Sequence, residues 1–248
     1  MFSELKWIAL AATLALAGAH APQKVAAQQW AQERMNWKVS CSVDRGAYRK
    51  SGDTHLFTPS ANRCTGGTYQ QRTELTGKTI RVNRPATYLF ETNISIQSDV
   101  ALRNQDTGLF AVFQVHSDQS RDGCAPPMSL IWNGRNQLEI FSDYSRTGGS
   151  NFCEENTALT RARHTGPTLQ RGGTVQNLRV LLEFDGSGGF DMTAFVDGKR
   201  AITGSYTPNR AAGYVPLESV YMKHGVYSPE RWPYEMRSKG LRVLRARN

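Results

Sequence analysis

Three stretches of the sequence carry polar, hydrogen-bonding or titratable side chains at every second position. In an extended strand, successive side chains point to opposite faces, so residues two apart share a face. Within residues 221–227, this spacing puts Tyr221, Lys223 and Tyr227 on one face, with Gly225 as a gap between them. A row of two phenols and one ammonium suits a chain-like anionic ligand better than a protein core.

The other two stretches follow the same rule. Their shared faces carry Gln70, Arg72 and Glu74 in the first stretch, and Gln114 and His116 in the second. Phe113 and Val115 take the opposite face of that second stretch. If the three strands belong to one sheet, their polar side chains line a single groove.

Taken one at a time, these residues have ordinary structural roles. Arg72 often pairs with a carboxylate such as Glu74. A lone histidine such as His116 is usually a hydrogen-bonded structural group, and a lone Tyr227 is typical of a core or rim aromatic. The combination on three strands is what indicates a functional surface. His224 falls on the opposite face of its strand, so we interpret it as structural.

The groove residues are poorly suited to glycoside hydrolysis, which normally needs two carboxylates flanking the scissile bond. Sandwich-fold glycosidases carry Glu-x-Asp-x-x-Glu on a strand. The nearest sequence here is Glu183-Phe184-Asp185, and Gly188 occupies the position of the last glutamate. The pattern therefore argues against a hydrolase.

The same residues suit β-elimination on a uronic acid. Removing the proton next to the carboxylate builds negative charge on that carboxylate, which positioned donors must neutralise. We assign that role to Arg72 and Gln114. A base must take the C5 proton and an acid must protonate the departing glycosidic oxygen, each typically worth on the order of 10²–10⁴-fold in rate. His116 and Tyr227 can supply these two groups.

The N-terminal segment predicts export. Lys6 is followed by an apolar run over residues 7–18 and then by small residues, a secretory signal pattern that is too short to span a bilayer. We expect residues 1–27 to be a signal peptide and residues 28–248 to be a single β domain. Cleavage after Ala19 and a buried N-terminal helix are the alternatives. The mature protein is then expected to be secreted or periplasmic, with no membrane anchor.

The charge of the chain narrows its partners. Its 248 residues carry 30 Lys and Arg against 21 Asp and Glu, a formal net charge of +9. Such a protein attracts anions by long-range steering. The cations are spread along the sequence, without the Lys/Arg-rich run or motif of a nucleic-acid-binding protein. We expect an acidic polysaccharide as partner and no nucleic acid; an ordinary solvated basic surface is the alternative.

Four cysteines in an exported chain predict two disulfides. They are Cys41, Cys64, Cys124 and Cys153. Three pairings are open, and Cys41–Cys64 with Cys124–Cys153 closes the shortest loops. A zinc site is the competing interpretation, but Cys-x-x-Cys and paired-histidine spacings are absent, so we expect no metal.

Strand patterns recur through the rest of the chain. They cover residues 88–97, 130–132, 138–141, 175–184, 190–196, 199–206, 217–227 and 241–247. Asp197-Gly198 is typical of a type I′ hairpin turn. Residues 28–40 are Gln-rich and indicate a short helix or a tail, and residues 154–160 indicate a helical turn. Many short strands between Gly, Asn and Asp turns predict an all-β sandwich or jelly roll.

Together the three polar stretches resemble a known family. In order and wide spacing they are similar to the three signature strands of the alginate lyases of polysaccharide lyase family 7. The matching motifs are Arg72-Thr73-Glu74-Leu75, Gln114-Val115-His116 and Tyr221-Met222-Lys223-His224-Gly225-Val226-Tyr227. Each motif alone is weak, but three in the right order are fairly specific, and they span most of the mature chain.

The resemblance implies a β-jelly roll, a concanavalin A-like sandwich with a concave substrate groove. It implies that Arg72 and Gln114 neutralise the carboxylate. His116 would assist or act as the base, depending on the epimer. Tyr227 would be the acid, and also the base for the other epimer. The residues expected to bind substrate are Gln70, Glu74, Tyr221 and Lys223.

Two positions depart from the family motifs. Thr76 stands where the first motif usually has Arg, and Met222 stands where the third usually has Phe. These departures bear on the substrate more than on the reaction, because related jelly-roll lyases of glucuronan or heparin-type chains carry similar Lys-x-Gly-x-Tyr strands. Val115, in the middle of Gln-x-His, leans toward mannuronate-rich chains.

We therefore predict an exported, monomeric polysaccharide lyase that cleaves a uronic-acid polymer by β-elimination without a metal or other cofactor. Mannuronate-rich alginate is the first expected substrate, and glucuronan or another glucuronate polymer is the second. A non-catalytic carbohydrate-binding jelly roll is the alternative from another class. Such a module has no need of His116 and Tyr227 together.

Overall fold

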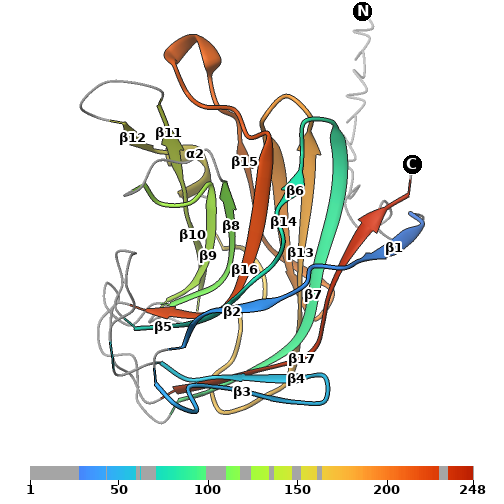
Figure 1. Cartoon of the computed structure of the whole chain (residues 1–248), viewed down its shortest axis with the longest axis vertical. Helices are drawn as coiled ribbons and strands as arrows, with labels where there is room; N and C mark the ends of the chain where they lie inside the picture. The colour runs from blue at the N-terminus through green and yellow to red at the C-terminus, as the bar shows by residue number, and fades with distance from the viewer. Residues whose placement is uncertain are drawn as a thin grey trace, which may run out of the picture.

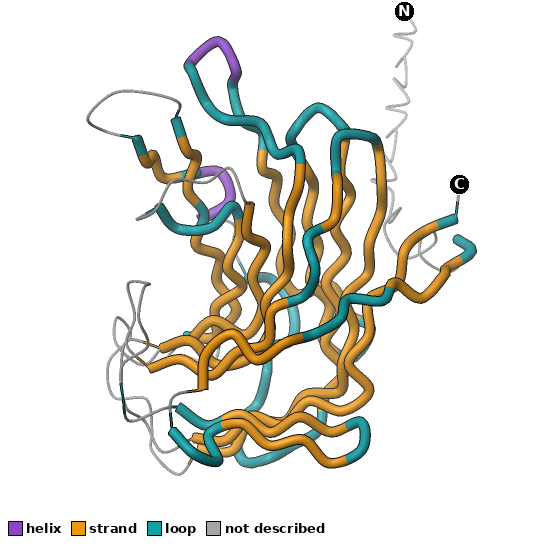
Figure 2. The backbone as a smooth tube through the Cα atoms, in the orientation of Figure 1, coloured by secondary structure: helices purple, strands orange, loops and turns teal. Residues whose placement is uncertain are grey.

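Strands and loops make up almost all of the part of the chain that the structure, a computed structural model, describes (Figure 2). That part comprises residues 28–42, 44–59, 62, 71–98, 110–117, 124–133, 137–146, 152–160, 164–228 and 234–247. The all-β prediction is confirmed. The predicted signal peptide, residues 1–27, lies outside the described residues, and the single domain over residues 28–248 stays a prediction.

Two antiparallel sheets stack against each other and form the body of the fold (Figure 1). We name each sheet after a central strand. The β7 sheet has the order β15 (Lys199–Tyr206), β14 (Phe190–Val196), β13 (Gln176–Asp185), β7 (Pro85–Ser98), β17 (Tyr234–Ala246), β4 (Thr54–Phe57) and β3 (Tyr48–Ser51), with β1 (Trp30–Glu33) paired to β17.

The β16 sheet contains the three polar stretches as neighbours. Its order is β10 (Leu138–Phe141), β9 (Met128–Trp132), β8 (Phe110–Ser117), β16 (Ser219–Ser228), β5 (Gln71–Thr76) and β2 (Lys38–Ser42), with β6 (Ile80–Arg81) paired to β16. The motif strands β8, β16 and β5 are therefore adjacent, which confirms that they share one sheet. A separate two-stranded ribbon pairs β11 (Asp143–Ser145) with β12 (Cys153–Glu155).

Apolar side chains from the inner faces of both sheets form the core. Phe90 of β7 and Phe113 of β8 meet with ring centroids 4.3 Å apart, and both are fully buried. Val115 and Met222 are buried beside them. The alternation expected of a sheet with one buried face is therefore present in β8 and β16, and their other face is left for polar groups.

Three local predictions need correction or adjustment. Residues 28–40, predicted as a helix or tail, instead contain β1 and begin β2, which add to the edges of the two sheets. An edge strand gains backbone hydrogen bonds from its neighbour without needing a strong apolar alternation of its own. The helical turn is shorter than predicted, at α2 (Thr157–Thr160), because residues 153–155 pair as β12. The last strand, predicted from residue 241, already begins at Tyr234.

The Asp197-Gly198 turn joins β14 to β15 as predicted. Asp197 and Gly198 have positive φ values of 50° and 75°, as a type I′ turn requires at both central positions. Apart from α2, the described residues hold one short 3-10 helix, η1 (Arg210–Ala212). Neither helix in this part of the chain has the length and apolar character that crossing a membrane would take.

Candidate active site

The strand register sets which side chains lie beside one another on the outer face of the β16 sheet. Lys223 of β16 is opposite Thr76 of β5 on one side and Gln114 of β8 on the other. Residues directly opposite in antiparallel strands point to the same face. Continuing outward gives a row with one residue from each strand: Lys38, Thr76, Lys223, Gln114, Ser129 and Phe141. We call this set the transverse row.

Of the four predicted catalytic residues, Gln114 lies in the transverse row and the other three flank it. On one side of it, Tyr227 is opposite Arg72, whose guanidinium carbon lies 5.5 Å from the centre of the Tyr227 ring. On the other side, His116 is opposite Tyr221, and their rings stack with centroids 5.1 Å apart. Four aromatic or cationic groups thus converge around Gln114 from three adjacent strands.

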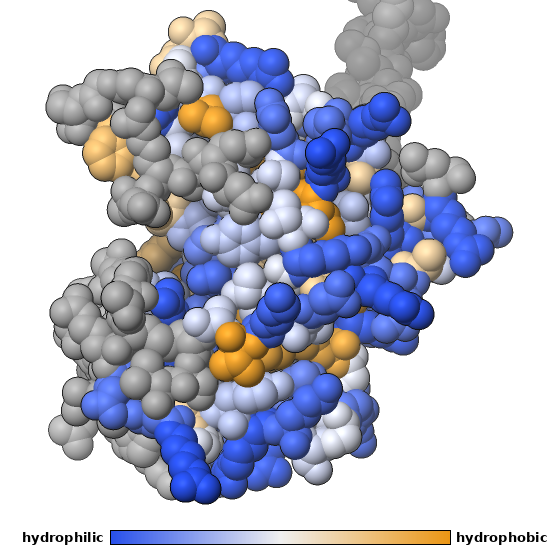
Figure 3. Space-filling model, in the orientation of Figure 1, coloured by the Kyte–Doolittle hydropathy of each residue, from blue (hydrophilic) through white to orange (hydrophobic). Residues whose placement is uncertain are grey.

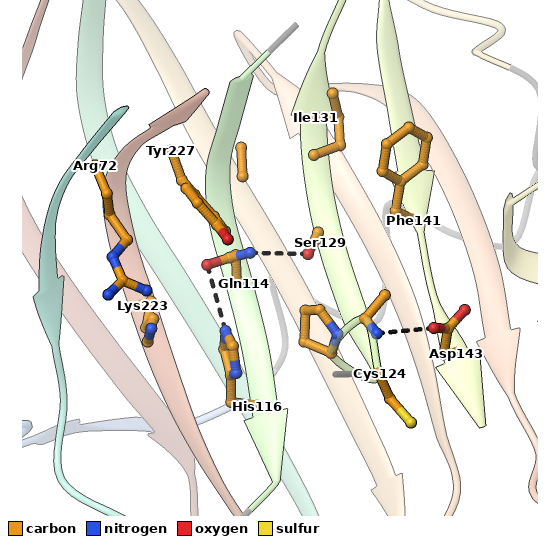
Figure 4. Close-up of a pocket in the computed structure, with 13 residues that line it drawn as sticks. Arg72, Gln114, His116, Cys124, Ser129, Ile131, Phe141, Asp143, Lys223 and Tyr227 are labelled. Atoms are coloured by element: carbon orange, nitrogen blue, oxygen red, sulfur yellow. Dashed lines mark hydrogen bonds between the residues drawn. The ribbon is translucent and has the colours of Figure 1, made fainter. Parts of the chain in front are cut away.

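These side chains line a pocket of about 570 Å³ (Figure 4). The predicted groove residues in its lining are Arg72, Gln114, His116, Lys223 and Tyr227. Further lining residues that the sequence analysis did not assign to the groove are Ala111, Cys124, Ala125, Pro126, Ser129, Ile131, Phe141 and Asp143. The pocket therefore has a cationic side built by β5 and β16 and a more apolar side built by β9 and β10.

Gln114 is held at both ends of its amide, with 2% of the residue exposed. Its Nε2 donates a hydrogen bond to Ser129 Oγ at 2.9 Å, and its Oε1 lies 3.3 Å from His116 Nε2 (Figure 4). In this arrangement His116 donates from Nε2, which leaves Nδ1 as the ring nitrogen able to accept a proton. Ser129 thus orients the amide that in turn orients the histidine.

The His116 ring is neutral at neutral pH. Burial, the largest cause, and the nearby charges of Lys223 and Arg72 together lower the pKa of His116 to about 3. A neutral imidazole can accept a proton, whereas an imidazolium cannot. The environment therefore keeps His116 in the form that a base requires.

Glu74 lies beneath the pocket and holds its two cations together. Its Oε2 is 3.7 Å from Arg72 Nε and 3.7 Å from Lys223 Nζ, and its side chain is only 1% exposed. Burial raises the pKa of Glu74, and the charges of Lys223 and Arg72 oppose that shift. Glu74 is outside the pocket lining, so its closest contacts are with the two cations that line it.

Gly225 allows β16 to approach β5 at this point. Its φ is +151°, and a Cβ added there would lie 2.3 Å from the backbone oxygen of Thr73. Any other residue would push the two strands apart. The register places Gly225 opposite Glu74, so the close approach occurs next to the buried carboxylate.

His224 faces the core on the opposite side of β16, as predicted. Its Nδ1 lies 2.7 Å from the backbone oxygen of Val112, and its Nε2 lies 2.5 Å from Ser238 Oγ of β17. Because β17 belongs to the β7 sheet, this histidine links the two sheets directly behind the pocket.

A disulfide and a carboxylate fix the apolar side of the pocket. Cys124 is bonded to Cys153, which confirms one pair of the shortest-loop prediction. Cys64 of the other predicted pair lies outside the described residues. Asp143 Oδ2 accepts a hydrogen bond of 2.7 Å from the backbone N–H of Ala125 (Figure 4). Burial raises the pKa of Asp143, and the Ala125 hydrogen bond opposes that shift.

Among the comparisons with known proteins, the one with solved structures finds matches. No protein-family model matches the sequence, and no curated protein matches it either. Solved structures do match. Alginate lyase A1-II′, a member of polysaccharide lyase family 7, aligns with a TM-score of 0.52 and 14% identity over 83% of this chain and 86% of its own. Alginate lyase AlyC3 aligns with a TM-score of 0.53 and 14% identity over 78% of this chain and 75% of its own.

The fold is that of the family 7 alginate lyases. A second AlyC3 structure, in complex with dimannuronate, aligns with a TM-score of 0.50 and 12% identity over 79% of this chain and 75% of its own. At these identities the likeness establishes the fold. The predicted β-jelly roll is confirmed, as is the resemblance to family 7 at the level of the fold.

Within this family 7 fold, most of the predicted site residues come together. Arg72, Gln114, His116, Lys223 and Tyr227 line one pocket. Tyr221 stacks on His116 at its edge, Glu74 lies underneath, and Gln70 lies outside the described residues. Ser129 and Asp143 were missed. Ser129 is the one polar residue in the apolar run of β9, a signal that becomes meaningful only once the register places it beside Gln114.

Proposed function

We propose that this protein is an exported, monomeric polysaccharide lyase that cleaves a uronic-acid polymer by β-elimination. The observation that carries the proposal is the convergence of Arg72, Gln114, His116 and Tyr227 in one pocket of a family 7 fold. This set supplies carboxylate neutralisation, a base and an acid. Export and the monomeric state rest on the sequence alone.

Arg72 and Gln114 would neutralise the substrate carboxylate. The Gln114 amide nitrogen has two hydrogens, and the bond to Ser129 Oγ uses one of them. The second can be donated to a carboxylate oxygen while the Arg72 guanidinium supplies a full charge. Both groups are held in place before the reaction, which is the condition under which electrostatic stabilisation is most effective.

The proton steps follow from the two titratable groups. The base takes the C5 proton, the electron pair forms the C4–C5 double bond, and the C4–oxygen bond breaks. Tyr227 donates its hydroxyl proton to the departing oxygen. His116 Nδ1 takes the C5 proton for one epimer. For the other, Tyr227 in its phenolate form takes the C5 proton and then passes that proton to the departing oxygen. An incoming carboxylate adds negative charge beside His116, which favours its protonated form and raises its basicity during turnover.

The substrate class is a polyuronate, and mannuronate-rich alginate is the first to test. AlyC3, one of the structures with this fold, has been solved in complex with dimannuronate. The two positions that depart from the family motifs, Met222 and Thr76, differ in what they imply for the substrate. Met222 is fully buried, so it does not contact a ligand in the pocket. Thr76 lies beside Lys223 in the transverse row and leaves that row with one cation fewer than an arginine would give. A glucuronate polymer is for that reason the second candidate.

The test is ultraviolet absorbance on mixing the mature protein with mannuronan, guluronan, glucuronan, heparin-type chains and pectate. Elimination leaves a double bond conjugated to the carboxylate, which absorbs where the substrate does not. We expect a rise on one polymer. Replacement of Tyr227 by Phe should reduce the rate by at least about 10²-fold while polymer binding is retained.

Tyr214→Phe is the matched control, because it removes a phenol that is not part of the pocket lining. It should leave the rate unchanged. Full turnover by Tyr227→Phe would refute the assigned acid. Polymer binding by the parent protein without any absorbance rise would instead identify a non-catalytic carbohydrate-binding jelly roll.

A further inference from the structure

A second polar cavity lies away from the pocket, where β6 and the start of β7 meet β1 and the end of β17. It has a volume of about 450 Å³. Its polar lining residues include Lys78, Thr79, Arg81, Asn83, Arg84 and Arg245. We call it the basic cleft. Figure 3 shows hydrophilic side chains gathered over the part of the front face where Figure 1 places β6 and the upper end of β7.

The cations of the basic cleft are only partly neutralised. Lys78 Nζ pairs with Glu33 Oε1 at 2.6 Å, which balances one charge. Arg81, Arg84 and Arg245 are exposed, and within the described residues no ion pair involves any of the three. Three guanidinium groups around one cavity repel one another, so the arrangement is more stable when an anion occupies it.

We propose that the basic cleft is a second, non-catalytic binding site for an acidic polysaccharide. Planar guanidinium groups match carboxylates in a two-pronged fashion. The Asn83 amide and the Thr79 hydroxyl, also in the lining, suit the hydroxyl groups between successive carboxylates. The identity of the ligand as the polymer that is cleaved rests on the proposed function.

The fold connects the basic cleft to the pocket. Arg81 of β6 is opposite Ser219 of β16, so both point to the outer face of the β16 sheet. Tyr221, which stacks on His116, comes two residues later on that same face. At about 3.3 Å per residue, Ser219 lies roughly 13 Å along β16 from Lys223. A polymer of several sugars is therefore long enough to occupy both sites.

A chain held at both sites behaves differently from a short oligomer. Binding at the basic cleft raises the effective concentration of the remaining chain at the pocket. That gain is lost for an oligomer too short to reach both. The basic cleft therefore lowers the KM for polymer and leaves the chemical step, and hence kcat, unchanged.

The experiment measures binding without turnover. The background is the Tyr227→Phe protein and the probe is mannuronan, titrated by calorimetry. We expect the triple variant Arg81→Ser, Arg84→Ser and Arg245→Ser to raise the Kd about tenfold, because each exposed charge pair contributes modestly. A control triple variant removes the same charge from exposed positions outside both cavities: Arg49→Ser, Lys50→Ser and Lys199→Ser. We expect this control to change the Kd less than twofold.

Equal weakening by both triple variants would mean that only net charge matters and would overturn the proposal. So would unchanged binding in the cleft variant, or no binding of mannuronan by the background protein. With Tyr227 intact, the cleft variant should raise the KM for polymer while kcat and the kinetics on a trisaccharide stay the same. The lyase proposal is tested separately: if it is wrong, the parent protein gives no absorbance rise. That outcome would not change the binding result measured by calorimetry.

Discussion

Ser129 is a small residue with a large influence on the pocket. Its hydroxyl takes one hydrogen of the Gln114 amide and so decides which way that amide is turned. The amide orientation in turn decides which nitrogen of His116 carries the ring proton. Ser129 is therefore a positioning residue, because in the structure its contact with the reacting groups runs through Gln114.

Replacing Ser129 by Ala should lower kcat about five- to tenfold, since one hydrogen bond of about 1 kcal/mol is lost and the amide can turn over. Ser129→Thr keeps a hydroxyl and should retain most of the activity. The measurement is the pH profile of kcat in the ultraviolet assay. A merely structural role would lower the rate of Ser129→Ala without moving its profile, and that result would contradict the assignment.

Glu74 controls the spacing of the two positive charges in the pocket. It is a carboxylate whose nearest charged groups are the two cations that line the pocket. Without it, Arg72 and Lys223 would repel each other and move apart. The buried carboxylate thus fixes the spacing of the positive charges at the pocket surface, even though it lies below that surface.

At the scale of elements, the approach of β16 to β5 depends on Gly225. An alanine there would suffer both an unfavourable φ and a Cβ placed 2.3 Å from the Thr73 oxygen. We expect Gly225→Ala to destabilise the fold by about 3 kcal/mol or more and to abolish turnover. The unfolding free energy in urea is the measurement.

Gly46→Ala provides the matched control for this prediction. Gly46 also has a positive φ, of +87°, but an added Cβ would meet nothing within 4 Å. It should therefore show the cost of the backbone conformation alone, about 1 kcal/mol. Equal destabilisation by the two variants would show that the contact with Thr73 is unimportant.

The sequence predicts strands better than it predicts their pairing. The period-2 pattern around Arg72, Gln114 and Lys223 identifies three strands and the face that each exposes. It does not contain the register, because pairing depends on residues far apart in the chain. Ser129 was missed for that reason. The strands within residues 28–40 were missed for a different reason. Edge strands are stabilised largely by hydrogen bonds to the neighbour's backbone, so their sequences show little apolar alternation.

At the scale of the whole molecule, two imidazoles are kept neutral by the fold. Burial lowers the pKa of both His116 and His224 from 6.5 to about 3. His224 sits among Phe57 and Phe90, with His55 as the nearby titratable group that lowers its pKa further. Between these pKa values the unfolded chain binds more protons than the folded one. The stabilisation is therefore complete above about pH 6.5 and is lost as the pH falls toward 3.

We expect the unfolding free energy to fall by about 1–3 kcal/mol per pH unit between pH 5.5 and pH 4. Glu74 acts in the opposite sense, because its raised pKa contributes stability that is lost as the pH rises. Urea denaturation at several pH values measures the net slope. A flat profile over this range would contradict the expected net slope.

The sequence also does not show which of its positive charges the fold brings together. Along the chain, Arg81, Arg84 and Arg245 belong to a basic composition without any run of cations. The pairing of β6 with β16 and of β1 with β17 helps to bring them around one cavity. Composition predicts an anionic partner, but only the folded chain shows where such a partner would bind.

The transverse row has a consequence for how the protein acquires its activity. Strands β5 and β8 are made before β16, and each pairs on one side only, β5 with β2 and β8 with β9, until β16, near the end of the chain, inserts between them. Pairings of this kind form slowly, and open strand edges invite aggregation meanwhile. A nascent or truncated chain that ends before β16 holds only fragments of the pocket. The proposed catalysis therefore requires β16 between β5 and β8, so regained activity during refolding would report that this strand has inserted.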